Sequence, residues 1–207
     1  ASFFPEGTLV STPAGEVEIQ DLEIGDEVYA YNFETGEVVV REVLDTSSNG
    51  THIWFDIKID GESITATRYH EFWVESESLW IFAKDLKVGM VLRLQDGSLK
   101  QITQVERREV KDREPTFNLE VAVDHNYFVG DSKVLVHNGT TYITYTVTDV
   151  NKYGVRGTYT GFASGPDTMT PREIMKKRHR PKNSHPGHRF LDKPRLDRWG
   201  TDRGALR

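Results

Sequence analysis

The sequence predicts an all-β domain over residues 1–138, followed by a small α/β domain or fragment over residues 139–207. Short runs rich in β-branched and aromatic residues, separated by turn residues, fill the first part, and no convincing long helix interrupts them. The charge also changes sign: residues 1–138 hold 12 Lys and Arg against 26 Asp and Glu, whereas residues 139–207 hold 14 against 6. A basic module joined to an acidic carrier would show this pattern, and so would two parts that dock through opposite charge.

The composition excludes several kinds of site. At 207 residues, with 37% hydrophobic and 11% aromatic residues, the chain is long enough for one or two globular domains. Cysteine is absent, which excludes disulfides, zinc–thiolate sites and thiol nucleophiles from this chain. No apolar run approaches the roughly eighteen residues of a membrane span, and the opening ASFFPEGTLV lacks a basic leader region. We therefore expect a soluble chain without a membrane span, excised from a longer precursor.

The strand-like runs of the first part follow one another closely. In chain order they are TLVST, EVEIQ, EVYAYN, EVVVREVLDT, HIWFDIKI, ESITAT, LWIF, MVLRLQ, QITQVERREV, TFNLEVAV, NYFVG and KVLVH. Turn-forming stretches separate them, among them PAGE, FETGE, SSNGT, IDGE, QDGS and VGDS. The pattern Asp-Leu-x-(Ile/Val)-Gly occurs before a strand in DLEIGDEV (21–28) and again in DLKVGMVL (85–92). This repeat indicates a duplicated hairpin unit with pseudo-twofold symmetry.

The second part has a different pattern. Residues 140–165 predict two strands joined by a Gly-containing connection. TPREIMKKRHR then predicts a helix with Thr170 as its N-cap and Pro171 in its first position. From Pro181 onward the chain is basic and rich in Pro and Gly, so we expect loop or disorder there.

The stretch VLVHNGT (134–140) allows two interpretations. Asn-Gly after an apolar strand is a common hairpin turn, because both residues tolerate positive φ. Alternatively, the Asn138 carboxamide attacks its own backbone carbonyl, forms a succinimide and breaks the bond to Gly139.

Four motifs, in their order along the chain, point to the second interpretation. They are FFPEGT (Phe3–Thr8), DLEIGDEV, TRYH (Thr67–His70) and the closing segment FNLEVAVDHNYFVGDSKVLVHN, which ends at Asn138. Together they resemble the Hint superfamily, which contains inteins, hedgehog autoprocessing domains and bacterial intein-like domains. The resemblance implies the horseshoe-like, all-β Hint fold over residues 1–138.

The resemblance also implies roles for individual residues. At the N-terminal end a nucleophile in the first position attacks the preceding carbonyl, the histidine of TxxH protonates the departing nitrogen, and the threonine holds the strained bond. Thr67 matches that threonine, and His70 matches that histidine. The alternative for His70, and for His125 discussed next, is an ordinary half-buried strand histidine.

At the C-terminal end, the resemblance assigns His137 to polarise the Asn138 carbonyl and to protonate the leaving nitrogen of Gly139, with His125 assisting. Histidine suits these steps because its pKa lies near neutrality. Splicing would need Ser, Thr or Cys directly after Asn138 to accept the acyl group, whereas this chain has Gly139. The expected outcome is therefore cleavage of the Asn138–Gly139 bond.

The opening departs from the family pattern. The first residue is usually Cys, but this chain offers Ala1, Ser2 and Phe3. An amide-to-thioester shift at the bond next to Ala1 is excluded, and Ser2 could support only a slower ester analogue. We interpret this as an engineered or degenerate nucleophile. In addition, Asn118 stands where many members carry an aspartate that couples the two cleavage sites, so we expect weak coupling.

This pattern resembles the Hint domains that precede the C-terminal toxin in bacterial polymorphic toxins. It implies an autoprocessing domain whose substrate is its own flanking chain, within a secreted or delivered bacterial toxin that also has an immunity protein as a partner. Autoprocessing requires no cofactor and no metal. The rival interpretation is a processing-dead Hint scaffold that binds and masks a cationic nuclease toxin.

The basic tail resembles the core of GIY-YIG-like nucleases less closely. Tyr145 and Tyr159 match the two strand tyrosines of that family, and Arg172 or Arg178 matches the helix arginine. A complete nuclease of this kind would hold a divalent metal, but no glutamate follows Glu173. The alternative is that these residues are strand aromatics and a solvated helix face, on a tail that binds nucleic acid through charge alone.

Overall fold

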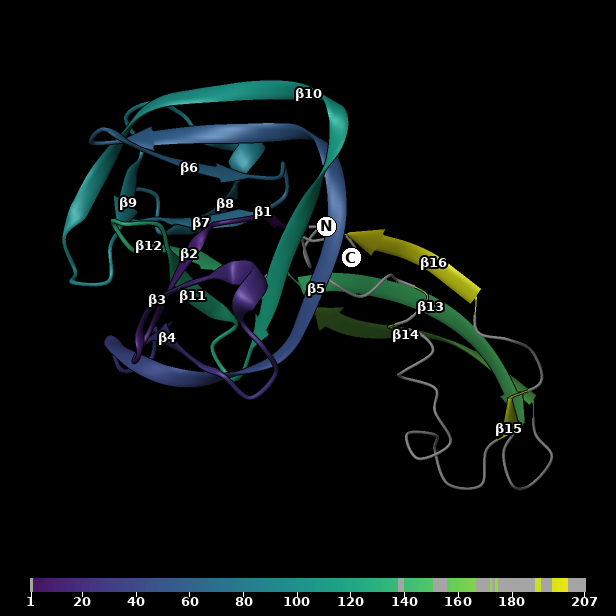
Figure 1. Cartoon of the computed structure of the whole chain (residues 1–207). Coiled ribbons are helices and arrows are strands. Elements are labelled where there is room, and N and C mark those ends of the chain that lie inside the picture. Colours follow the sequence, from purple (N-terminus) through teal and green to yellow (C-terminus); the bar gives the residue numbers. More distant parts are fainter. Residues whose placement is uncertain are drawn as a thin grey trace. The chain divides into compact units, whose positions relative to one another are not determined.

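The computed structural model describes residues 2–137, 140–150, 156–166, 172, 174, 189–190 and 195–200. The chain divides into two compact units, residues 1–139 and residues 140–207 (Figure 1). We call them the first and the second unit and describe each by itself.

The first unit is built from strands and two short 3-10 helices, which confirms the all-β prediction for this part of the chain. Its strands are β1 (Phe4–Pro5), β2 (Leu9–Thr12), β3 (Gly15–Glu18), β4 (Glu27–Asn32), β5 (Glu37–Ile59), β6 (Glu62–Ala66), β7 (Glu71–Val74), β8 (Leu79–Phe82), β9 (Val91–Arg93), β10 (Leu99–Val121), β11 (Asn126–Val129) and β12 (Val134–His137). The 3-10 helices are η1 (Ile19–Asp21) and η2 (Ala83–Asp85). Among the described residues, none forms a helix that is long and apolar enough to cross a membrane.

The strands of the first unit join into one strongly curved sheet. Its order is β3-β2-β11-β12-β7-β9-β10-β5-β4, with β1 on β10, β6 on β5 and β8 on β7. Figure 1 shows β5 and β10 as two long ribbons that bend together around the unit. Buried side chains from many of these strands form one core, which includes Phe4, Ile57, Phe72, Leu119 and Val136.

The sequence-based expectation of a break at SSNGT is wrong. Residues 47–51 lie inside β5, and β10 is likewise continuous where two separate runs were expected. Ser47–Thr51 pair with Glu114–Asn118 in antiparallel register, and the extra residues are absorbed by an irregularity between Glu109 and Glu114. Ladder hydrogen bonds to a partner strand outweigh local turn preference, because they satisfy the backbone groups of both strands at once.

The repeated Asp-Leu-x-(Ile/Val)-Gly pattern corresponds to repeated structure. After η1, the Gly25 N–H donates to Val43 O at 2.9 Å, and after η2 the Gly89 N–H donates to Ile102 O at 2.9 Å. Both glycines have positive φ, +95° and +96°, a conformation that costs glycine no Cβ clash. In each copy the following strand, β4 or β9, pairs with one of the two long strands. The predicted pseudo-twofold hairpin duplication is therefore confirmed.

The described residues of the second unit form four strands: β13 (Thr140–Val150), β14 (Arg156–Pro166), β15 (Arg189–Phe190) and β16 (Arg195–Gly200). β13 pairs with all three others. The two predicted strands are present. The expectation of loop from Pro181 onward is wrong for β15 and β16, because β13 supplies backbone partners that composition does not reveal. Of the helix predicted after Thr170, Arg172 and Ile174 are helical, and the rest lies outside the described residues.

Candidate functional site

The opening of the chain is clamped by the TRYH segment. The Phe3 N–H donates to Thr67 Oγ1 at 2.9 Å, and the Thr67 N–H donates to Phe3 O at 3.0 Å. The Thr67 hydroxyl also lies 3.3 Å from Phe3 O, to which it donates. β1 then continues the sheet by pairing with β10. Thr67 thus holds the peptide groups on both sides of residue 3.

Ser2, the candidate nucleophile, lies against the same segment. Its side chain is buried, and its Oγ donates a hydrogen bond to Tyr69 O at 2.9 Å. A hydroxyl whose proton is held by a backbone carbonyl is not paired with a base in this arrangement. Ala1 lies outside the described residues.

His70 is completely buried directly behind the opening strand. Its ring centroid lies 4.0 Å from that of Phe4, and neither ring nitrogen has a hydrogen-bond partner in the described part of the chain. Burial first, and the charge of His137 second, lower the pKa of His70 well below its usual value of 6.5. The ring is therefore neutral near pH 7, with one donor and one acceptor unused. Buried polar groups are rarely left unpaired. The His70 ring is therefore a candidate for a catalytic role, in which it forms a hydrogen bond or transfers a proton only during the reaction.

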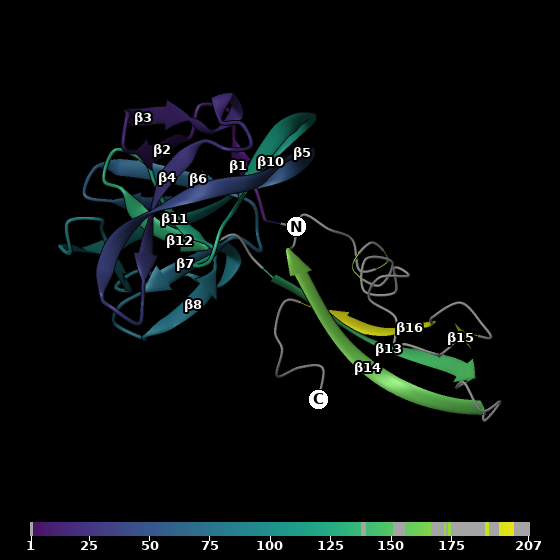
Figure 2. The ribbon, with the colours of Figure 1, turned by 90° about the horizontal axis from the view of Figure 1, so that it is seen from below.

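His137 ends β12 and lies between two strands. Its register partners are Asn126 on β11 and Glu71 on β7. Figure 2 shows β12 between β11 and β7. The Nδ1 atom lies 3.0 Å from Oε2 of Glu71, although Nδ1 is not aligned for a hydrogen bond. The Trp80 ring packs against the imidazole, with centroids 4.9 Å apart and planes tilted by 47°. The residue next to Asn138 is thus held by a carboxylate and an aromatic ring.

His125 lies beside His137, with ring centroids 6.5 Å apart. It belongs to the turn between β10 and β11 rather than to a strand, and the backbone has positive φ at both Val123 (+65°) and His125 (+54°). Such conformations are strained for residues other than glycine and gather at functional turns. The pKa of His125 is lowered, mainly by burial and then by the His137 charge, while Asp124 opposes the shift.

Asn118 and Tyr127 form a buried polar pair next to Phe4. The Asn118 Oδ1 accepts from the Tyr127 hydroxyl at 2.7 Å and from the Leu119 N–H at 2.8 Å. Its Nδ2 is buried without a partner among the described residues. The Tyr127 ring lies 6.2 Å from that of Phe4. The position where many family members carry an aspartate is therefore buried in the first unit and is linked by a hydrogen bond to Tyr127, whose ring lies near Phe4.

The predicted site residues of the first unit form two sets of contacts in the structure. Thr67 holds Phe3, Phe4 packs on His70, and His137 contacts Glu71 and lies near His125. Asn138 and Gly139 lie outside the described residues.

The candidates on the tail are less fully described. Tyr145 is buried on β13, and register places Tyr159 of β14 opposite Val147, two positions along from Tyr145. Arg172 is exposed, and Arg178 lies outside the described residues. No group of three or more His, Asp or Glu side chains suited to a metal is present in the described parts of either unit.

The sequence alone did not identify Glu71, Trp80 and Tyr127. Glu71 follows TRYH directly, which is the one local signal that could have marked it. Its neighbour His137 is 66 positions away, and only the pairing of β7 with β12 brings them together. The register of two distant strands is not readable from a single sequence.

A family model described as "Pretoxin HINT domain" matches residues 9–139. The chain belongs to this family. A solved bacterial intein-like domain from Clostridium thermocellum is similar at 34% identity, with 66% of this chain and 98% of that chain covered and a TM-score of 0.63. The gp41-1 intein is similar at 25% identity, with 67% and 99% covered and a TM-score of 0.55. No curated protein matches the chain.

A DnaB intein from Synechocystis sp. PCC 6803 shares the fold at 23% identity, with 66% of this chain and 98% of that chain covered and a TM-score of 0.57. The curved sheet and its duplicated hairpin are therefore those of the Hint fold. The first unit is an autoprocessing domain of the pretoxin HINT type, as the motifs predicted.

Proposed function

We propose that this pretoxin HINT domain releases the chain that begins at Gly139 by cyclisation of Asn138. The observation that carries the proposal is the setting of His137, the residue before Asn138, which lies beside Glu71, Trp80 and His125. A histidine held in this way can take up and return a proton next to the bond that breaks.

The reaction is an intramolecular acyl transfer. The Asn138 Nδ2 attacks the Asn138 carbonyl carbon, the C–N bond to Gly139 breaks, and a succinimide closes on residue 138. The proton that Nδ2 loses is balanced by the proton that the Gly139 nitrogen gains, and His137 carries it between them. The step uses only side chains of this chain, so no cofactor takes part.

The N-terminal end does not contribute a splicing reaction in this proposal. Cysteine is absent, and the Ser2 hydroxyl donates to Tyr69 O rather than to a base. Gly139 has no side chain that could accept an acyl group. In this proposal Thr67 and His70 belong to an N-terminal site whose nucleophile is either Ser2 or has been lost. The reaction at Asn138 therefore ends in cleavage rather than in ligation.

The match to a pretoxin family supports a biological setting for this reaction. We propose that the domain is part of a polymorphic toxin that is secreted or delivered, and that the second unit is part of its cationic toxin. The substrate of the HINT domain is its own flanking chain. The partner expected for the toxin is an immunity protein.

Mass spectrometry of the purified chain during incubation at mild temperature tests the proposal. A fragment beginning at Gly139 should accumulate slowly. Asn138→Ala should abolish it, because alanine has no attacking amide, and His137→Ala should slow it by about a hundredfold or more. His52→Ala is the matched control, since His52 is exposed on β5 and should leave the rate unchanged.

Deamidation at Asn-Gly is the competing reaction. There the Gly139 nitrogen attacks the Asn138 side-chain carbonyl and ammonia leaves, and water then opens the succinimide to aspartate or isoaspartate. The backbone stays continuous, and the mass changes only by the small difference between Asn and Asp. If incubation of the unmodified chain yields only this product, autoprocessing at Asn138 is refuted and the rival role, masking of a cationic toxin, is favoured.

A further inference from the structure

We propose that Glu71 is a positioning residue for His137. Its carboxylate keeps the proton of the neutral imidazole on Nδ1, so that Nε2 is the atom that accepts and returns the proton during cyclisation of Asn138. This inference rests on the proposed function. It concerns a residue that the motifs do not assign, and it is carried by the geometry of three neighbouring strands.

The pleat of the sheet explains why the groups meet. Side chains alternate between faces along a strand, and residues directly opposite on paired strands share a face. Glu71 is opposite His137 across β7 and β12, and Trp73, two residues after Glu71, is opposite Trp80 across β7 and β8. These four side chains therefore share one face. The intervening Phe72 and its partner Val136 are fully buried on the other face.

The aromatic rings restrict how the imidazole can turn. Trp80 packs on His137 at 4.9 Å, and Trp73 packs on Trp80 at 5.4 Å with an interplanar angle of 67°. Phe33 lies against both tryptophans, at 4.7 Å from Trp73 and 5.8 Å from Trp80. A ring packed in such an array keeps its Nδ1 edge toward Glu71.

The carboxylate and the imidazole are both largely removed from water. Their side chains are 17% exposed for His137 and 16% for Glu71, so their interaction is less screened than that of a surface pair. The Nδ1–Oε2 distance of 3.0 Å is already within hydrogen-bond range, so the pair lacks alignment but not proximity. Catalytic hydrogen bonds are often poorly aligned in the resting state and tighten during reaction.

Among the side chains found near His137, Glu71 is the carboxylate that can compensate a positive charge on the imidazole. His70 and His125 carry no negative charge, and a charge on His137 lowers the pKa of each. Asp124 is already paired with Arg41 at 2.6 Å. When Nε2 takes the proton that Asn138 Nδ2 releases, the ring becomes an imidazolium, and the Glu71 carboxylate compensates that charge. The proton then moves from Nε2 to the Gly139 nitrogen. This is the orienting and stabilising task of the carboxylate in a carboxylate–histidine pair.

The first test reads the proton directly in the chain carrying Asn138→Ala, which cannot cleave. Imidazole 15N shifts and their long-range couplings to ring protons report which nitrogen of His137 is protonated in the neutral ring. We expect the Nδ1–H tautomer, and a shift to the Nε2–H tautomer or to a mixture when Glu71→Ala is added. An Nε2–H tautomer with Glu71 present, or no change on its removal, would overturn the inference.

The second test measures release of the Gly139 fragment in chains that retain Asn138. Glu71→Ala should slow release of the fragment by about 10-fold to 100-fold. Glu71→Gln should retain part of the parent rate, because its amide oxygen still accepts a hydrogen bond. Glu71→Asp should retain most of the parent rate, because it keeps the carboxylate. Glu77→Ala, in the exposed turn after β7, is the matched control and should match the parent.

The two tests separate this inference from the proposed function. If the parent chain releases no fragment, the proposed function fails, and the tautomer measurement still decides what Glu71 does to His137. If the parent cleaves and Glu71→Ala cleaves equally fast, the inference is wrong even where the tautomer changes.

Discussion

His70 illustrates how a single residue couples stability to the site. Its ring is fully buried against Phe4, and its two nitrogens have no partner within the described residues. Such a group lowers stability unless it remains neutral, because a buried charge without a partner is costly. The first unit keeps this unfavourable group directly behind the segment that Thr67 clamps, where a proton donor would serve N-terminal cleavage.

The depressed pKa of His70 predicts a loss of stability in acid. The folded chain resists protonation below the usual value of 6.5, whereas the unfolded chain binds the proton there. Stability is therefore fully present above about pH 6.5 and falls as the pH drops toward the folded-state pKa, by up to about 1.4 kcal/mol per pH unit from this group. Urea unfolding between pH 7.5 and about 5.5, above the main carboxylate range, measures this slope.

His70→Gln should reduce that slope, because glutamine does not titrate, and His125, whose pKa is also lowered, accounts for part of what remains. His52→Gln, at an exposed position on β5, controls for the loss of an unrelated histidine. If the His70→Gln chain unfolds too readily to measure, the imidazole NMR signals of His70 in the parent chain give the same answer. A His70 ring that protonates at its usual pH, or an unchanged slope, would contradict the prediction.

At the scale of elements, the turn from β11 to β12 ties the closing hairpin to β6. The Glu62 carboxylate accepts from the Asp131 N–H at 2.7 Å and from the Ser132 N–H at 3.0 Å. Gly130, at the start of this turn, has φ +80°, and a Cβ there would lie 2.5 Å from Glu62 Oε1. The turn therefore depends on glycine both for its backbone conformation and for the close approach of Glu62.

Gly130→Ala should be more destabilising than Gly61→Ala. Gly61 has nearly the same φ, +79°, but a Cβ added there meets nothing within 4 Å. Both variants carry the strain of alanine at positive φ, about 1–2 kcal/mol, and only Gly130→Ala also displaces Glu62, which adds about 1 kcal/mol for weakened hydrogen bonds. Urea midpoints of the two variants measure the difference, and equal losses would show that Glu62 moves aside without cost.

The strands show what the sequence could and could not predict. β4 begins and ends at the expected residues, and β2, β11 and β12 nearly so, because alternating apolar residues and nearby turn residues act locally. The sequence divides β5 in two, because SSNGT indicates a turn until a partner strand is known, and it also predicts two separate runs where β10 is continuous. Thr67 and His70 carry a motif, but Glu71 acquires its neighbour only through strand register.

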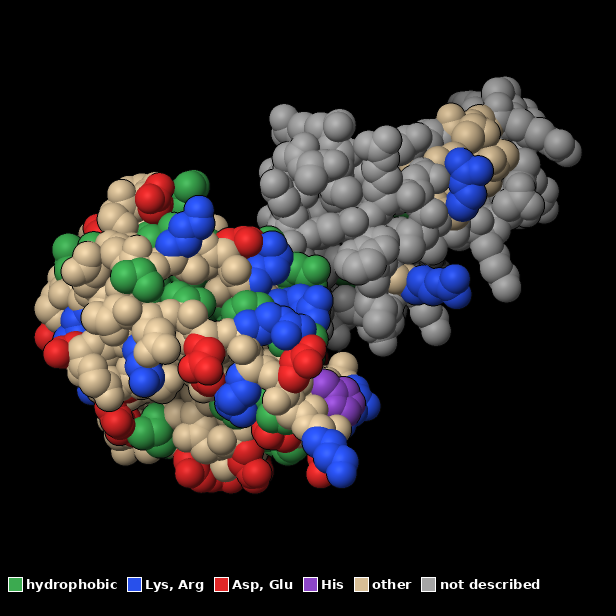
Figure 3. Space-filling view, turned by 90° about the horizontal axis from the view of Figure 1, so that it is seen from above, with side chains coloured by type: hydrophobic (Ala, Val, Ile, Leu, Met, Phe, Trp, Pro, Cys, Tyr) green, Lys and Arg blue, Asp and Glu red, His purple; other side chains and the backbone are tan. Residues whose placement is uncertain are grey.

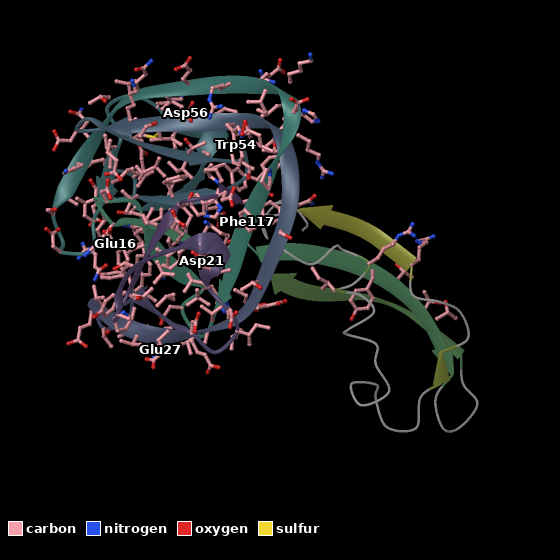
Figure 4. All side chains as sticks on the ribbon, viewed as in Figure 1. Glu16, Asp21, Glu27, Trp54, Asp56 and Phe117 are labelled. Carbon is pink, nitrogen blue, oxygen red and sulfur yellow. The ribbon has the colours of Figure 1, made fainter. Side chains whose placement is uncertain are left out.

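At the scale of the whole molecule, the two units differ in charge. The first 138 residues carry 26 acidic side chains against 12 basic ones, and the remainder 6 against 14. Exposed acidic residues of the first unit include Glu16, Asp21 and Glu27, on β3, η1 and β4 (Figure 4). Figure 3 shows acidic and basic side chains interspersed over one face of this unit. The negative charge is thus spread over that face rather than gathered in one patch.

The net positive charge of the second unit predicts nucleic-acid binding that depends steeply on salt. Lys and Arg that neutralise phosphates release counterions, so about six contacts would lower the affinity about a thousandfold between 50 and 200 mM salt. Fluorescence anisotropy with the uncleaved Asn138→Ala chain and a labelled duplex measures this slope. Arg172→Ala, at an exposed position of the second unit, should reduce the slope by about one contact, whereas Lys58→Ala on β5 should not change it. Binding that is insensitive to salt would exclude recognition by charge alone and would favour a base-specific or shape-specific site on the second unit.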